Sequence, residues 1–150
     1  MITKKLSVVI PCFNEGKTIY QNIRKINDYL LKRIASFEII AVNDGSIDDT
    51  LAELKRVQSE IPIKIVNDTE NSGKGNAVRD GILSASDLSD IVMFLDADLG
   101  IPIEELEKFL GEIDKGADVV IASRFVPGLK IMRPVLWYRK IMEKVFRYVR

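Results

Sequence analysis

The chain has 150 residues, 47% of them hydrophobic, which is enough apolar material for the core of one ordinary globular domain. Its 22 basic and 22 acidic residues cancel, which argues against a bulk electrostatic attraction to nucleic acid. With one cysteine, Cys12, and no histidine, the chain can form neither an internal disulfide framework nor a zinc site built from Cys and His. Catalysis must therefore use carboxylates, hydroxyls, cations or an oxygen-bound metal.

Strand-length apolar runs alternate with segments of helical periodicity. In chain order we predict a strand at 6–10, a helix at 17–34, a strand at 38–42, a helix at 46–59, a strand at 63–66, a helix at 74–85, a strand at 91–95, a helix at 103–113 and a strand at 118–122. Ser46 and Asp49 resemble a capping box for the second helix, and Ala77, Val78 and Ile82 are expected to face inward from the third. Apolar strands that are each followed by a helix indicate an α/β fold, a mostly parallel sheet with helices on both faces.

Ligands of such sheets bind beyond the carboxyl ends of the strands, so the residues that follow each strand are the candidates for a site. The first strand is followed by 11–15, which contain no glycine, and this disfavours a Rossmann or P-loop phosphate site. Asp44 follows the second strand, where it could bind a base or ribose or simply belong to a turn and helix cap. Gly73 and Gly75 follow the third strand and allow close backbone approach to a ligand, although a plain turn would use them too.

Asp96-Ala97-Asp98 follows the fourth strand and is the most informative segment. Two carboxylates so close repel each other unless a cation or a proton offsets their charge. Mg²⁺ or Mn²⁺ would do this and could also bridge a diphosphate, whereas two solvated turn carboxylates are the plain alternative. Arg124, after the fifth strand, could hold phosphate oxygens or form a surface ion pair.

Together these motifs resemble the inverting family-two glycosyltransferases of the GT-A fold, and most of all the dolichyl- or polyprenyl-phosphate mannosyl- and glucosyltransferases. The resemblance runs from about Leu6 to Phe125. It rests on Val9-Ile10-Pro11 with Asn14-Glu15, on Asn43-Asp44-Gly45-Ser46, on Asn71-x-Gly73-x-Gly75, on Asp96-Ala97-Asp98 and on Ser123-Arg124.

The resemblance implies transfer of a hexose, with inversion, from a nucleotide diphosphate sugar of the UDP-glucose or GDP-mannose type to a lipid phosphate. It implies a nucleotide pocket lined by Pro11, Asn14, Glu15, Asp44, Gly73, Lys74, Gly75 and Asp96, with Asp96 and Asp98 as ligands of Mg²⁺ or Mn²⁺. Asp98 and Arg124 would stabilise the departing diphosphate. Gly100 stands where many lipid-phosphate mannosyltransferases have a Gln ligand, so water is expected to complete the metal shell.

The domain organisation implied is a nucleotide-sugar-binding core at 1–125, followed by a basic amphipathic segment at 126–150 that begins the acceptor part. The remaining acceptor part of the family's catalytic domain is absent, so we expect a truncated domain. Trp137, Tyr138 and the basic residues around them suit a membrane interface, and the apolar face there could support a homo-oligomer; an ordinary helix packed on the sheet is the alternative.

No signal peptide and no membrane-spanning stretch is predicted, since no apolar run reaches about 20 residues. We therefore expect a cytoplasmic protein, peripheral to or anchored at the cytoplasmic face of a membrane. Two other functions stay open: a nucleotide-sugar-binding module without turnover, and a nucleotidyltransferase. The latter usually has a glycine-rich, basic loop after its first strand, which this chain lacks. A phosphatase of the haloacid-dehalogenase type would carry its Asp-x-Asp on the first strand.

Overall fold

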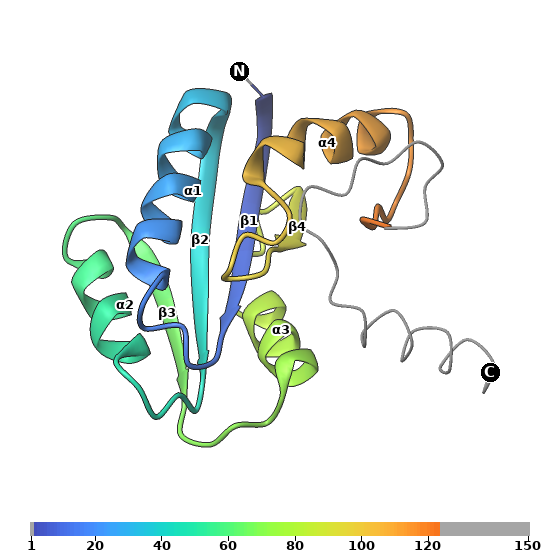
Figure 1. Cartoon of the computed structure of the whole chain (residues 1–150). Coiled ribbons are helices and arrows are strands. Elements are labelled where there is room, and N and C mark those ends of the chain that lie inside the picture. Colours follow the sequence, from blue (N-terminus) through green and yellow to red (C-terminus); the bar gives the residue numbers. More distant parts are fainter. Residues whose placement is uncertain (1, 124–150) are drawn as a thin grey trace, which may run out of the picture. The chain divides into compact units, whose positions relative to one another are not determined.

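Strands and helices alternate along the computed structural model, which describes residues 2–123 (Figure 1). The strands are β1 (Ile2–Cys12), β2 (Ile34–Asp44), β3 (Ile63–Asp68) and β4 (Ile91–Phe94). The helices are α1 (Ile19–Arg33), α2 (Thr50–Gln58), α3 (Lys74–Leu83) and α4 (Leu106–Asp114), with a 3-10 turn, η1 (Ile103–Glu105), directly before α4. All four strands and the first three helices belong to one compact unit, Met1–Glu107, and Lys108 begins a second unit.

The four strands form one parallel sheet in the order β3-β2-β1-β4, which confirms the predicted α/β class. Val9, at the centre of β1, pairs with Ile40 of β2 on one side and with Phe94 of β4 on the other. Next to β1, on one side, lies β2, followed by β3 at that edge of the sheet. On the opposite side of β1 lies β4. The carboxyl ends of β1 and β4 therefore flank the switch in strand order, which is where open α/β sheets bind ligands.

Helices cover both faces of the sheet, as predicted (Figure 1). Crossovers between parallel strands are right-handed, so a helix changes face when the direction of strand addition reverses. The strands β1, β2 and β3 follow one another in one direction, and β4 lies in the other. On one face α1 and α2 contact each other and the strands, with buried Ile19, Ile23, Ile26, Leu30, Leu54 and Val57. On the other face α3 packs on β1 and β2. A core of Val9, Ile40, Val42 and Ala77 lies there.

The inward face of α3 differs in part from the prediction. Ala77 is buried, but Ile82 is 44% exposed, and Gly81 faces the sheet instead. A Cβ atom at Gly81 would lie 2.2 Å from Val9 Cγ1 and 2.9 Å from Val42 Cγ2. The helix therefore approaches β1 and β2 so closely that only glycine fits at this position, and this turns Ile82 outward.

Two predicted local features are wrong. Residues 118–122 form no strand, and Val119 and Ile121 are about four-fifths exposed, 79% and 80%. A strand is held by hydrogen bonds to a neighbour, and within residues 2–123 this segment pairs with none. The capping box is also absent: α2 begins at Thr50, whose N–H donates to Asp48 Oδ1, while Ser46 Oγ accepts from the N–H of Asn14.

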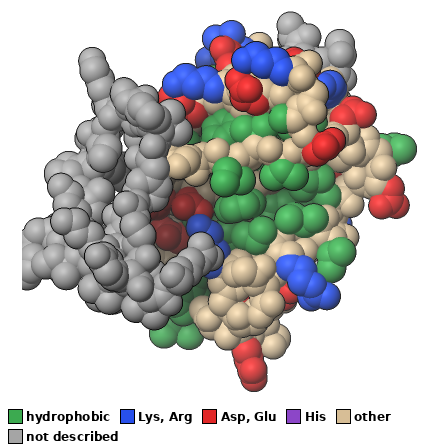
Figure 2. Space-filling model, turned by 90° about the vertical axis from the view of Figure 1, so that its right-hand side faces the viewer, with side chains coloured by type: hydrophobic (Ala, Val, Ile, Leu, Met, Phe, Trp, Pro, Cys, Tyr) green, Lys and Arg blue, Asp and Glu red, His purple; other side chains and the backbone are tan. Residues whose placement is uncertain are grey.

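Apolar side chains gather on the side of the molecule that carries β4, which Figure 2 views. Val92 and Phe94 of β4 are 40% and 52% exposed, and Leu83 at the end of α3 is 69% exposed. No helix among the described residues has the length and hydrophobicity to cross a membrane. The predicted C-terminal segment at 126–150, with Trp137 and Tyr138, lies outside the described residues.

Candidate functional site

The loop after β1 is tied to the turn after β2. The N–H of Asn14 donates to Ser46 Oγ at 3.0 Å, and Asn14 Oδ1 accepts from the N–H of Ile47 at 3.0 Å. The N–H of Glu15 donates to Thr50 Oγ1 at 2.7 Å. Asn14 has a φ of +56°, in the left-handed region that asparagine tolerates better than most residues. The two loops therefore form one braced layer at the carboxyl ends of neighbouring strands.

Asp44 is only 2% exposed and holds the turn that precedes α3. Its Oδ1 accepts from Ser72 N–H at 2.7 Å and from Ser72 Oγ at 3.1 Å, and its Oδ2 accepts from Gly73 N–H at 3.0 Å. Gly73 itself has a φ of +91°, which favours glycine. Asp44 thus determines where α3 begins, a role that the sequence did not suggest.

Lys74 and Asp96, both predicted site residues, meet at the same edge of the sheet. Lys74 Nζ donates to Asp96 Oδ1 at 2.5 Å, and the two side chains are 58% and 46% exposed. Lys74 opens α3, whose first amide groups have no partner within the helix and point beyond its N-terminus. This end of α3 therefore offers N–H groups and an ammonium to an anion.

The paired carboxylates lie in a tight turn after β4. Leu99 N–H donates to Asp96 O at 3.0 Å, Gly100 N–H donates to Asp98 Oδ1 at 2.8 Å, and Leu99 has a φ of +51°. Asn22 of α1 donates through Nδ2 to Ala97 O at 2.8 Å and so anchors the turn. Asn22 carries no signal in the sequence, because no motif marks an asparagine whose partner is a backbone carbonyl 75 residues away.

These carboxylates suit one kind of metal site. Among residues 2–123 no group of three or more His, Cys, Asp or Glu side chains is arranged to hold a metal ion. Mg²⁺ is commonly bound by one or two protein carboxylates together with substrate phosphates and water. Asp96 and Asp98 lie on one turn and fit that donor set. They therefore suit a cation that binds together with a diphosphate.

Cys12 is unsuited to nucleophilic chemistry. Burial, followed by the charge of Glu15, raises the pKa of Cys12 to about 12, so the side chain is a neutral thiol near pH 7. Its Sγ donates to the carbonyl of Ile10 at 3.2 Å. The thiol therefore packs the end of β1 and does not act as a nucleophile at this edge.

Asp68, at the end of β3, is a carboxylate whose environment disfavours its negative charge. Its Oδ2 is buried and finds no hydrogen-bond partner in the described part of the chain. Partial burial, with the nearby charges of Asp80 and Asp44, raises the pKa of Asp68 above its usual 3.8. A raised pKa means that the contribution of Asp68 to stability is fully present below pH 3.8 and is lost as pH rises through the folded-state pKa.

Asp68→Asn is therefore expected to raise the free energy of unfolding at pH 7, because it removes a charge that the fold disfavours. The gain should shrink as pH falls toward 3.8, where the wild-type carboxyl becomes neutral as well. Urea denaturation of both proteins at pH 7 and pH 4 measures this. A gain that is equal at the two pH values would contradict the explanation.

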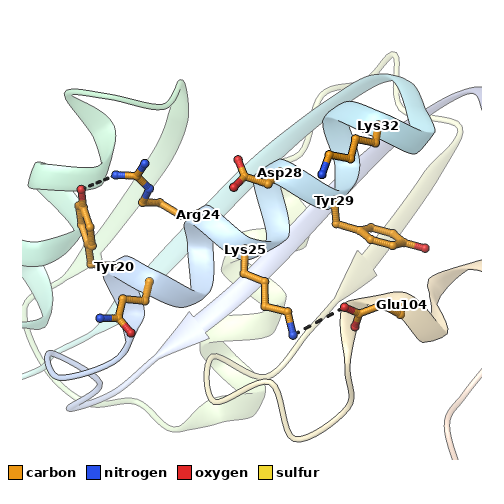
Figure 3. Close-up of a pocket in the computed structure, with 8 residues that line it drawn as sticks. Tyr20, Arg24, Lys25, Asp28, Tyr29, Lys32 and Glu104 are labelled. Atoms are coloured by element: carbon orange, nitrogen blue, oxygen red, sulfur yellow. Dashed lines mark hydrogen bonds and ion pairs between the residues drawn. The ribbon is translucent and has the colours of Figure 1, made fainter.

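A groove elsewhere on the molecule does not take part in this site (Figure 3). It runs along the outer face of α1 and is lined by Tyr20, Gln21, Arg24, Lys25, Asp28, Tyr29, Lys32 and Glu104. Arg24 donates to Tyr20 Oη at 2.8 Å and to Glu60 Oε2 at 2.9 Å, and Lys25 pairs with Glu104 at 3.6 Å. None of the predicted site residues lines it, and two of its cations already have anionic partners.

Most of the predicted site residues lie at one edge of the sheet. Pro11 pairs with Val42 near the ends of β1 and β2, next to the braced loops. A direct chain of contacts joins Asp44, Gly73, Lys74 and Asp96, and Gly75 follows in the first turn of α3. Asp98 lies two residues beyond Asp96. Arg124 lies outside the described residues.

Residues 7–146 match the model of the family described as glycosyl transferase family 2. A dolichol-phosphate mannosyltransferase of Pyrococcus furiosus is 34% identical over 142 residues, which cover 93% of this chain and 38% of that protein. An uncharacterized glycosyltransferase of Synechocystis sp., sll0501, is 34% identical over 146 residues, which cover 97% of this chain and 44% of that protein. The chain thus spans less than half of the length of these relatives.

Solved structures with the same fold include a mannosyltransferase, PcManGT of Pyrobaculum calidifontis, in complex with GDP-Man and Mn²⁺. It has a TM-score of 0.56 and 26% identity, covering 65% of this chain and 28% of that one. Glucosyl-3-phosphoglycerate synthase of Mycobacterium tuberculosis, in complex with Mn²⁺, UDP and glucosyl-3-phosphoglycerate, has a TM-score of 0.58 and 28% identity, covering 73% of this chain and 39% of that one. The resemblance drawn from the motifs is confirmed: the chain belongs to glycosyl transferase family 2.

Proposed function

We propose that this chain forms the donor site of a glycosyltransferase, which binds a nucleotide diphosphate sugar of the UDP-glucose or GDP-mannose type together with Mg²⁺ or Mn²⁺. The observation that carries the proposal is the shared edge of Asp44, the N-terminus of α3, Lys74 and Asp96 at the switch in strand order. Glycosyl transferase family 2 membership favours glycosyl transfer over nucleotidyl transfer. Complexes of similar structures with Mn²⁺ support the choice of a divalent cation.

Each residue at the edge has a proposed role. Pro11, Asn14 and Glu15 line the nucleoside side of the pocket, and Asp44 orders the turn that Gly73, Lys74 and Gly75 present to the nucleotide. Asp96 and Asp98 hold the cation, which when bound supplies positive charge to the diphosphate. Lys74 and Arg124 add charge to the same phosphates, and so favour departure of the nucleoside diphosphate as the acceptor attacks the anomeric carbon with inversion.

The proposed acceptor is a polyprenyl or dolichyl phosphate. The support is the name of the Pyrococcus furiosus relative, a dolichol-phosphate mannosyltransferase. A phosphate acceptor is anionic at neutral pH and needs no general base to remove a proton. We propose that 1–125 is the donor-binding core, and that 126–150 begins the acceptor part and approaches the cytoplasmic face of a membrane.

Calorimetric titration of UDP and of GDP into the chain, with Mn²⁺ or Mg²⁺ and then with a chelator, tests the donor site. We expect one nucleotide to bind only with the metal, and Asp98→Ala to weaken this binding at least about tenfold, which is about 1.4 kcal/mol. Asp28→Ala, which removes an exposed carboxylate from the groove on α1, is the matched control and should bind as wild type does. Binding that ignores both the chelator and the Asp98 substitution would contradict the proposal.

A further inference from the structure

The ion pair between Lys74 and Asp96 joins two groups that the proposed donor site uses for different partners. Lys74 Nζ is 2.5 Å from Asp96 Oδ1 and 5.8 Å from the centre of the Phe94 ring. Asp96 is proposed to hold the cation, and Lys74 is proposed to hold the diphosphate. In this structure the lysine therefore binds the carboxylate that the cation needs.

The fold brings the pair together from two separate elements. Asp44 fixes Gly73, and Lys74 follows as the first residue of α3. Asp96 comes two residues after the end of β4, and the carbonyl of its neighbour Ala97 is held by Asn22. Because both backbones are anchored, the pair can separate through the rotamers of the long lysine side chain, with no movement of α3 or β4.

We propose that Lys74 serves as the counter-ion of Asp96 in the ligand-free protein and exchanges this carboxylate for the diphosphate when metal and nucleotide bind. The inference rests on the proposed function. A divalent cation and an ammonium at one carboxylate repel each other, so metal alone must displace Lys74 from its partner. A diphosphate offers the ammonium a new anion. Metal and nucleotide should therefore each favour the binding of the other.

Lys74→Met separates these effects, because methionine keeps the length and helix propensity but not the charge. We expect Lys74→Met to bind Mn²⁺ alone about two- to fivefold more tightly than wild type, the range set by the small strength of exposed ion pairs. Binding of UDP or GDP at saturating Mn²⁺ should be weaker in the variant. Electron paramagnetic resonance of free Mn²⁺, titrated with the 150-residue chain, measures the first quantity, and calorimetry measures the second.

Two control variants test whether the effect is specific to the pair. Arg79→Met removes a cation from the same helix, but Arg79 pairs with its neighbour Asp80 at 3.2 Å, so its Mn²⁺ affinity should stay at the wild-type value. Lys74→Arg keeps the positive charge, so its affinity for Mn²⁺ without nucleotide should also stay close to that of wild type.

Two results would overturn the inference alone, provided that nucleotide binding still depends on Asp98. One is a Mn²⁺ affinity of Lys74→Met that is no higher than that of wild type. The other is an equal gain in Arg79→Met, which would indicate a general effect of charge. If wild type and Lys74→Met both fail to bind Mn²⁺ alone and neither binds UDP or GDP in the presence of Mn²⁺, the inference is overturned together with the proposed function.

Discussion

Asp44→Ala is expected to lower the free energy of unfolding by about 2 kcal/mol and to release the turn that precedes α3. The substitution removes a buried carboxylate that accepts three hydrogen bonds from Ser72 and Gly73. Hydrogen bonds to charged groups are each worth about 1.5–3 kcal/mol, and water can replace part of them because Ser72 is exposed. The expected total loss is therefore close to the value of one such bond, well below the sum of three.

Two measurements on the ligand-free protein check this role. Urea denaturation gives the change in unfolding free energy, and amide hydrogen exchange should become faster at Ser72 and Gly73. Asp48→Ala is a matched control, because Asp48 also accepts three bonds, from Thr50 N–H, Thr50 Oγ1 and Gly16 N–H, but is exposed. Its loss of stability should be smaller. If Asp44→Ala leaves exchange at Ser72 and Gly73 unchanged, Asp44 does not hold the turn.

The order of the elements could be predicted from the sequence because buried strands and helices each have a characteristic pattern of apolar residues. Val8, Val9, Ile39 and Ile40 lie in strands covered on both faces, so their apolar runs are uninterrupted. Helix α1 buries one stripe, and its apolar residues recur at helical spacing. Segment 118–122 shows the limit of this reasoning, since a strand-like run forms a strand only when a neighbouring strand accepts its hydrogen bonds.

That the candidate residues share one edge of the sheet could also be predicted, because parallel strands bring their carboxyl ends to one edge. The partners of the side chains could not. The sequence predicts for Asp44 a contact to a base or ribose, or a place in a turn and helix cap, and it does not indicate the hydrogen bonds that Asp44 accepts from residues 28 and 29 positions further along the chain. The pairing of Lys74 with Asp96 depends on where α3 starts relative to β4. Such contacts follow from the packed backbone and leave no periodic signal.

Gly75→Ala is expected to weaken nucleotide binding at least about tenfold, or about 1.4 kcal/mol, without loss of stability. A Cβ atom at Gly75 would meet nothing within 4 Å, and its φ is not among the positive values of the described residues. Alanine is a better helix former than glycine by up to about 1 kcal/mol, so the free energy of unfolding should stay equal or rise. The fold of residues 2–123 therefore gives no reason for glycine at this position.

We infer that Gly75 allows a ligand to approach the first turn of α3 closely, which the added methyl group would obstruct. Gly45→Ala is the contrasting variant, because its φ is +61° and a Cβ atom there would lie 2.4 Å from both Asn71 N and Glu70 C. That variant should lose stability whether or not a nucleotide binds. Thermal denaturation with calorimetric titration of both variants separates a glycine required by folding from one required by binding. Wild-type affinity in Gly75→Ala would mean that the nucleotide does not approach α3, and the donor site would then have to lie nearer to the loop after β1.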